Sequence, residues 1–231
     1  MSDKKRILMI VTSHDQIDAE HPTGLWFEEF AVPYQLFLEQ DYPVTVASPK
    51  GGQTPIDPRS LPNAEQAQAH ASALEALQET QPLSQVKAED YDAVFLPGGH
   101  GTMYDLPTPE VGQIISQFAD AQKVIAAVCH GPAGLIEAMR SHNTPLVQGR
   151  KVTGFTNAEE QEVQLDKLMP FLLESRLREQ GAEFEEAENW RDHVVVDGHL
   201  ITGQNPQSSG SAAKAVINAL VASGRVEQLG K

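Results

Sequence analysis

The chain has 231 residues, of which 40% are hydrophobic, and its 32 acidic residues outnumber its 17 lysines and arginines, so its net charge is −15. A strongly acidic surface repels the phosphates of nucleic acids and of anionic membranes, which argues against both as partners. No apolar run reaches the roughly 18 residues of a membrane span, and the charged residues 1–6 do not resemble a secretory signal, so we expect a cytoplasmic protein.

Apolar runs of strand length alternate along the chain with segments of helical periodicity. Helical patterns cover Trp26 to Glu39, where Pro33 either kinks the helix or delays its start, and Glu110 to Ala121. Continuous apolar runs are typical of parallel strands that helices cover on both faces. Four runs have this character: Ile7 to Val11, Val44 to Ala47, Ala93 to Leu96 and Val124 to Val128. The alternation predicts a doubly wound α/β fold with a mostly parallel sheet and helices on both faces.

Two longer segments interrupt this alternation. Residues 49–90 begin with a loop rich in proline and glycine and include a short helix at Ala67 to Leu77. Residues 159–180 form a charged helical excursion, for which Gly181 is a candidate stop signal. We therefore predict one domain over residues 1–231, with insertions at about 49–90 and 159–190.

The end of the chain carries a hairpin signal and a final helix. Asp197-Gly198 is a dipeptide that favours a tight hairpin turn, and it lies between Val194 to Val196 and Leu200 to Thr202. A helix is predicted from about Ser209 to Ala222.

Cys129 is the only cysteine, so it is either an inert core residue or a reactive thiol. It follows the strand ending at Val128 and precedes small residues and an apparent helix. Small neighbours at Ala127 and Gly131 suit a tight turn that displays a nucleophile at the carboxyl end of a strand. A helix N-terminus and the adjacent His130 would favour the thiolate. We interpret Cys129 as reactive, although burial frequencies alone favour an inert core cysteine.

A second glycine turn, Pro97-Gly98-Gly99-His100-Gly101, also follows a predicted strand and is expected beside Cys129. Glycines allow close approach of the backbone to a ligand and can present N–H groups to an oxyanion. This turn alone is also compatible with an ordinary tight turn.

Together, the segments Pro97 to Gly101 and Ala127 to Pro132 resemble the ThiJ/PfpI superfamily, which has a class I glutamine-amidotransferase-like, flavodoxin-like fold. The likeness is greater to the branch of glutathione-independent glyoxalases and heat-shock-protein-31 chaperones. It extends nearly end to end, through Thr23 to Glu29, Val152 to Glu160 and Asp197 to Pro206.

The resemblance implies roles for individual residues. It places the nucleophile at Cys129, its partner at His130, an acidic residue of the first helix at Glu29 and the acid that orients the histidine at Glu160. Oxyanion or substrate binding falls on the turn that holds Gly99 and His100.

Two of these assignments depend on the register of a helix, because Glu28 and Glu159 are adjacent to Glu29 and Glu160. Neighbouring residues of a helix point about 100° apart, so only one of Glu28 and Glu29 can face the cysteine. A solvated helix face is the alternative interpretation of each glutamate.

We expect no cofactor and no required metal. Some members of the branch bind a metal, but the sequence shows no matching ligand set. Five residues of metal-binding types that lie close in sequence are better explained as a charged loop: His14, Asp15, Asp18, Glu20 and His21. The expected partners are a small aldehyde substrate and a second copy in a homodimer.

The function implied is that of a glutathione-independent glyoxalase of the D-lactate-forming type, which converts methylglyoxal or glyoxal to a hydroxy acid. A stress-related holdase chaperone, a protein deglycase using the same cysteine and a peptidase remain alternatives. Amidotransfer is discounted, because neither His193 nor His199 is followed by a glutamate two residues later.

Overall fold

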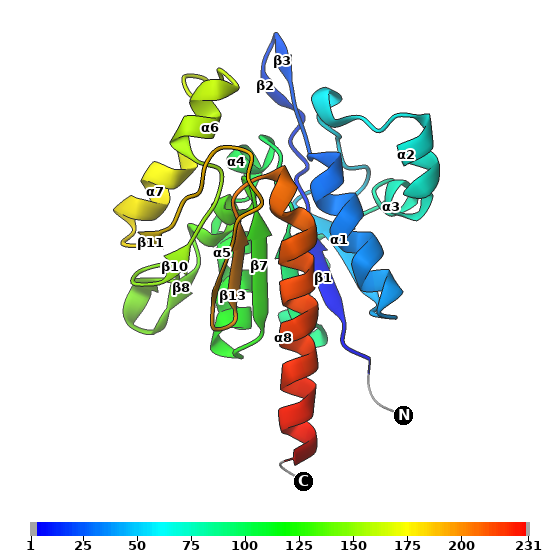
Figure 1. The fold of residues 1–231 in the computed structure, drawn as a ribbon, viewed down its shortest axis with the longest axis vertical. Coiled ribbons are helices and arrows are strands. Elements are labelled where there is room, and N and C mark those ends of the chain that lie inside the picture. The colour runs from blue at the N-terminus through cyan, green and yellow to red at the C-terminus, as the bar shows by residue number, and fades with distance from the viewer. Residues whose placement is uncertain (1–3, 230–231) are drawn as a thin grey trace.

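The computed structural model describes residues 4–229 (Figure 1). A seven-stranded sheet lies at its centre, in the order β12-β13-β7-β6-β1-β4-β5. Neighbouring strands are parallel except for β12, which is antiparallel to β13. The strands are β1 (Ile7–Ile10), β4 (Val44–Ser48), β5 (Gln81–Pro82), β6 (Ala93–Leu96), β7 (Val124–Val128), β12 (Val194–Asp197) and β13 (Leu200–Gly203). The predicted α/β fold with a mostly parallel sheet is confirmed.

Helices cover both faces of the sheet because each strand of its centre carries buried apolar side chains on both sides. On one face, α1 (Phe27–Glu39) and α8 (Ser209–Leu229) pack against each other and against the strands. On the other, α4 (Thr102–Asp105) and α5 (Pro109–Asp120) contribute Met103, Phe118 and their neighbours to a second core cluster.

The peripheral elements are short. Four helices complete the set: α2 (Ala64–Ala69), α3 (Ala71–Ala76), α6 (Asn157–Glu162) and α7 (Leu173–Glu179). Three two-stranded sheets pair β2 (Gln16–Asp18) with β3 (His21–Pro22), β8 (Met139–Arg140) with β9 (Thr144–Pro145) and β10 (Lys151–Val152) with β11 (Glu183–Phe184). The 3₁₀ turns are η1 (Pro58–Ser60), η2 (Leu83–Gln85), η3 (Ala88–Asp90), η4 (Gly131–Leu135), η5 (Ser141–Asn143) and η6 (Pro206–Ser208).

Several local predictions need correction. The helix predicted at Ala67 to Leu77 is two short helices, α2 and α3, separated at His70, whose backbone is not helical. The excursion at 159–180 likewise divides into α6 and α7. Pro33 does not delay α1, which begins six residues earlier at Phe27. The division into one domain with two insertions stays a prediction.

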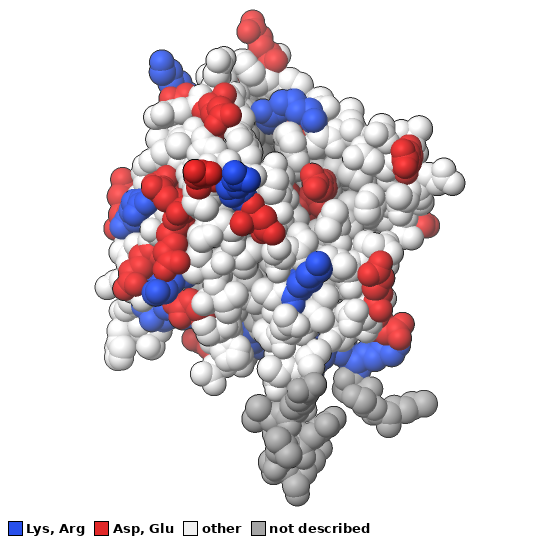
Figure 2. All heavy atoms as spheres, in the orientation of Figure 1, with Lys and Arg blue, Asp and Glu red and all other residues white. Residues whose placement is uncertain are grey.

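Figure 2 shows acidic side chains spread over one face, with fewer lysines and arginines among them, as the net charge requires. Within residues 4–229, no helix has both the length and the apolar composition of a membrane span.

Candidate active site

Cys129 lies where the central strand β7 ends. Leu96, the last residue of β6, pairs with Ala127, so the glycine turn after β6 and the cysteine after β7 lie side by side. Cys129 has a φ of 58°, in the left-handed region that non-glycine residues rarely adopt. A Cβ on Gly131 would lie 2.1 Å from the carbonyl oxygen of Leu96, so only glycine fits there. The tight turn predicted around the cysteine is thus present, and its backbone is strained at Cys129.

The turn leads into the 3₁₀ helix η4, not into the α-helix that the sequence pattern suggested. Gly131, Pro132 and Gly134 within it explain the difference, because these residues are poor formers of a continuous α-helix. The helix N-terminus beside the sulfur is therefore that of a short 3₁₀ helix.

The thiol is correspondingly harder to ionise than the sequence pattern suggested. Cys129 is 4% exposed, and this burial, together with the negative charge of Glu29, raises the pKa of its thiol. A thiol in this environment needs a neighbouring base to accept its proton when it reacts.

His130 is placed to be that base. Its Nδ1 atom lies 3.4 Å from the sulfur of Cys129, and its Nε2 atom lies 2.6 Å from Oε2 of Glu160. All three residues are buried. Burial alone would raise the pKa of Glu160, but the histidines that contact it hold this pKa well below its usual range. An ionised carboxylate therefore faces His130.

The fold brings Glu160 to this position from a distant part of the chain. The backbone N–H of Phe155 donates to the carbonyl of Cys129 at 2.9 Å, which fixes the segment that enters α6. Thr156 and Glu159 then form a capping box at the start of α6. Glu159 also accepts hydrogen bonds from Asn205 and from the backbone of Trp190. It therefore joins the start of α6 to two later segments of the chain, whereas Glu160 faces the histidine.

Glu29 approaches the cysteine from α1. Its side chain is fully buried, and its Oε2 accepts a hydrogen bond from the Gly98 N–H at 2.6 Å, whereas Glu28 is exposed. Burial raises the pKa of Glu29 to about 8, although its interaction with Cys129 acts in the opposite direction. Near neutral pH the carboxyl therefore keeps its proton, which removes part of the negative charge that disfavours the thiolate.

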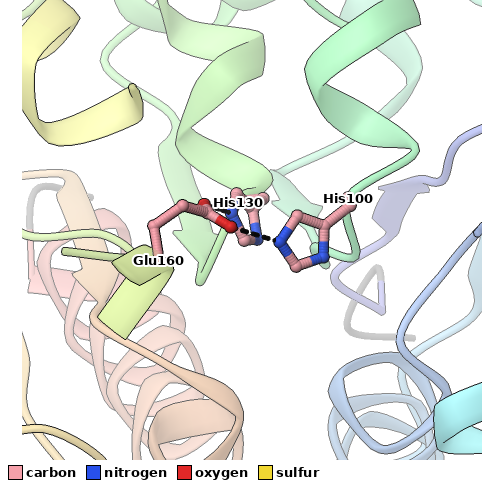
Figure 3. Close-up of side chains that lie close together, drawn as sticks. All are labelled: His100, His130 and Glu160. Atoms are coloured by element: carbon pink, nitrogen blue, oxygen red, sulfur yellow. Dashed lines mark hydrogen bonds and ion pairs between the residues drawn. The ribbon is translucent and has the colours of Figure 1, made fainter. Parts of the chain in front are cut away.

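The glycine turn after β6 contributes a backbone N–H group and the side chain of His100 to the site. Among the described residues, the N–H groups of Gly99 and His130 donate to no protein acceptor, so both are free for a substrate oxygen. The ring of His100 is fully engaged: Nε2 lies 2.6 Å from Oε1 of Glu160, and Nδ1 lies 3.1 Å from Nη2 of Arg59. Figure 3 shows His100 and His130 converging on the two oxygens of Glu160.

These groups line a small pocket of about 50 Å³, which has room for about four water-sized groups. The sequence alone indicated no role for four residues of its wall: Trp26, Arg59, Phe155 and Trp190. Trp26 and Phe155 lie in segments that carried the family resemblance. Arg59 had no signal of its own, because it lies in a loop without periodicity.

His100, His130 and Glu160 are a group of metal-ligand types within 4.8 Å of one another, which the sequence analysis did not bring together. Their arrangement does not fit a bound zinc ion. Ligands of one tetrahedral zinc ion lie about 3.3 Å apart, given zinc–ligand distances near 2.0 Å. The contacts of 2.6 Å instead fit hydrogen bonds from two N–H groups to one carboxylate.

Comparisons with known proteins find relatives that are similar in sequence and in fold. The model of the DJ-1/PfpI family matches residues 27–219. Glyoxalase 3 of Candida albicans is 30% identical, over 93% of this chain and 98% of its own, and the glutathione-independent glyoxalase hsp3101 of Schizosaccharomyces pombe is 30% identical, over 94% and 96%. The crystal structure of glyoxalase III from Candida albicans superimposes with a TM-score of 0.86, at 29% identity, over 93% of this chain and 97% of that one.

Proposed function

Since the chain belongs to the DJ-1/PfpI family, we propose that it is a glutathione-independent glyoxalase, which converts methylglyoxal or glyoxal to a hydroxy acid at Cys129. Relatives named glutathione-independent glyoxalases, about 30% identical over nearly the whole chain, support a glyoxalase-type function. The observation that carries the proposal is the position of Cys129 between His130 and the buried carboxyl of Glu29 in one small pocket.

The first step joins the substrate to the protein. The sulfur of Cys129 attacks the aldehyde carbon, His130 Nδ1 takes the thiol proton, and the carbonyl electron pair moves to the oxygen. The free N–H groups of Gly99 and His130 stabilise this oxyanion, which then regains a proton from His130. The product is a hemithioacetal, and Glu160 holds the histidine ring in position throughout.

The second step moves hydrogen between neighbouring carbons, so that the aldehyde carbon is oxidised and the ketone carbon is reduced. Glu29, in its ionised form, removes the proton from the carbon bonded to sulfur. The electron pair forms a carbon–carbon double bond, and the electron pair of the ketone C=O moves to its oxygen, which gives an enediolate. The same carboxyl returns the proton to the adjacent carbon, while the hydroxyl proton on the sulfur-bearing carbon passes to the enediolate oxygen, which leaves a thioester and an alcohol. A pKa of about 8 suits this exchange, because the group gains and loses a proton with little free-energy difference near neutral pH.

The third step releases the product. Water attacks the resulting thioester, the carbon–sulfur bond breaks, and the thiol is regenerated as the hydroxy acid leaves. For methylglyoxal the product is lactate, which we propose to be the D enantiomer. The atoms balance with water as the only co-reactant, so neither glutathione nor a cofactor takes part.

The pocket favours this activity over the alternatives. A space of about 50 Å³ fits a two- or three-carbon aldehyde better than a peptide. A deglycase would use the same cysteine, and a holdase chaperone would not need it. Both remain predictions, as do the homodimer and the cytoplasmic location.

The proposal is tested by following lactate formation from methylglyoxal with purified protein in buffer free of low-molecular-weight thiols. We expect turnover without glutathione and no increase when glutathione is added. Turnover that appears only with glutathione would show that the reacting thiol comes from solution, and the proposal would then be wrong.

A further inference from the structure

Arg59, whose side chain is 41% exposed, is connected to Cys129 by a continuous chain of side-chain contacts. Its Nη2 atom lies 3.1 Å from His100 Nδ1, and His100 Nε2 lies 2.6 Å from Glu160. The other oxygen of Glu160 contacts His130 Nε2, and His130 Nδ1 faces the sulfur of Cys129. Arg59 itself is part of the pocket wall.

The atom that carries the proton in each contact follows from the donor character of Arg59. A guanidinium is always protonated and only donates hydrogen bonds, so His100 Nδ1 must be the acceptor and carry no proton. The ring proton of neutral His100 then lies on Nε2 and is donated to Glu160. Because Glu160 accepts from both histidines, His130 also keeps its proton on Nε2, and its Nδ1 stays free to accept the thiol proton.

Several contacts fix the position of the Arg59 guanidinium beside His100. Its Nε and Nη2 donate to the two oxygens of Asp57, at 3.0 and 2.7 Å, in a bidentate pair. Asp57 has a fully buried side chain and also accepts from Thr23 Oγ1. The guanidinium additionally lies over the ring of Trp26, at 5.6 Å from its centroid.

We propose that Arg59 is a positioning residue, which fixes His100 as the neutral Nε2–H tautomer and thereby orients Glu160 and His130 for proton transfer from Cys129. The catalytic part of this statement rests on the proposed glyoxalase function, whereas the tautomer of His100 does not depend on it.

Removing Arg59 should raise the pKa of His100. The charged or titratable groups that face His100 are Arg59, Glu160 and His130, and Asp57 lies behind the arginine. Burial, helped by the charge of His130, lowers the pKa of His100 to about 4 in the intact site. Without the guanidinium, His100 lies between the carboxylates of Asp57 and Glu160, which favour the doubly protonated ring.

The test is nitrogen-15 NMR of the histidine rings, which distinguishes protonated from unprotonated Nδ1 and Nε2 without any turnover. In the native protein, with the signals assigned by His100→Gln, we expect His100 to carry a proton on Nε2 alone between pH 6 and 8. In Arg59→Met we expect Nδ1 to become protonated at a higher pH than in the native protein, with a kcat about tenfold or more lower and little change in KM.

Two further variants separate positioning from packing. Arg59→Met with Asp57→Asn removes the uncompensated carboxylate, so we expect the neutral His100 signal and part of the lost kcat to return; Arg59→Lys, which still donates, should retain the native tautomer. Arg150→Met breaks a similar pair with Asp197 outside the pocket and should leave His100 unchanged. A native His100 that carries its proton on Nδ1, or an Arg59→Met variant with unchanged His100 signals, would overturn the proposal even if the protein proves to be no glyoxalase.

Discussion

The Nε2 atom of His130 lies 2.6 Å from Oε2 of Glu160, and this contact leaves Nδ1 of the same ring pointing at the sulfur of Cys129. A neutral imidazole carries one proton on its two nitrogens, so a hydrogen bond donated by one nitrogen leaves the other free to accept a proton. Glu160 therefore acts on the cysteine indirectly, through the orientation and the tautomer of His130.

Replacing Cys129 with alanine should reduce glyoxalase turnover by at least about a thousandfold, because no other thiol is present to form the hemithioacetal. The fold should persist, since the change removes only the sulfur atom. Lactate formation and circular dichroism of the Cys129→Ala variant measure the two effects. Turnover within tenfold of the native protein would rule out covalent catalysis at this residue.

Glu160→Gln should retain measurable activity, about 10- to 100-fold below the native rate, because the amide oxygen still accepts from one histidine. Steady-state kinetics of this variant beside Cys129→Ala test the difference in role. Loss as complete as that of Cys129→Ala would mean that Glu160 does more than orient His130.

Glu159→Gln is the matched change one residue earlier, and its effect should be on stability. Glu159 accepts hydrogen bonds from Thr156, Trp190 and Asn205, and an amide nitrogen placed there leaves buried donors without acceptors. A loss of about 1–3 kcal/mol is expected, which lowers Tm by several degrees in a chain of this size. An unchanged Tm together with a large loss of kcat would show that the roles of Glu159 and Glu160 are exchanged.

The raised pKa of Glu29 also makes a prediction about stability. With a pKa of about 8 in the folded state and 4.5 as the ordinary value, the folded protein binds more protons between these pH values than the unfolded chain does. Stability contributed by this carboxyl is therefore present at low pH and lost as pH rises toward 8. Glutamine mimics the protonated form. The Tm of Glu29→Gln minus the native Tm should therefore increase as the pH is raised from 5 to 8.5. A constant difference across this range would mean that Glu29 ionises normally.

The sequence was sufficient for six of the seven strands of the sheet, all but β5, and for the tight turn at Cys129. The runs at Ile7, Ala93 and Val124 are apolar without alternation, which only strands buried on both faces require, and the glycines around Cys129 reflect close backbone contacts. These are local consequences of burial and of steric fit, so they are visible in a single chain.

The remainder of the site depends on contacts between distant segments. Arg59 reaches His100 because Leu25 pairs with Ile56 and draws the loop against the start of α1, and no local pattern encodes that pairing. The ionisation of Cys129 was misjudged for the same reason. The sequence showed a turn beside a histidine, whereas the depth of burial and the facing carboxyl of Glu29 depend on the folded structure.

The central claim is that Cys129 bonds to the aldehyde and that Glu29 then moves the proton. Native mass spectrometry of Glu29→Gln incubated with methylglyoxal tests both parts at once, with Glu28→Gln, an exposed neighbour, as the control. We predict an added mass of one methylglyoxal on Cys129 without lactate release in Glu29→Gln, and normal turnover in Glu28→Gln. Lactate release by Glu29→Gln at the native rate, or the absence of any adduct on Cys129, would contradict the account.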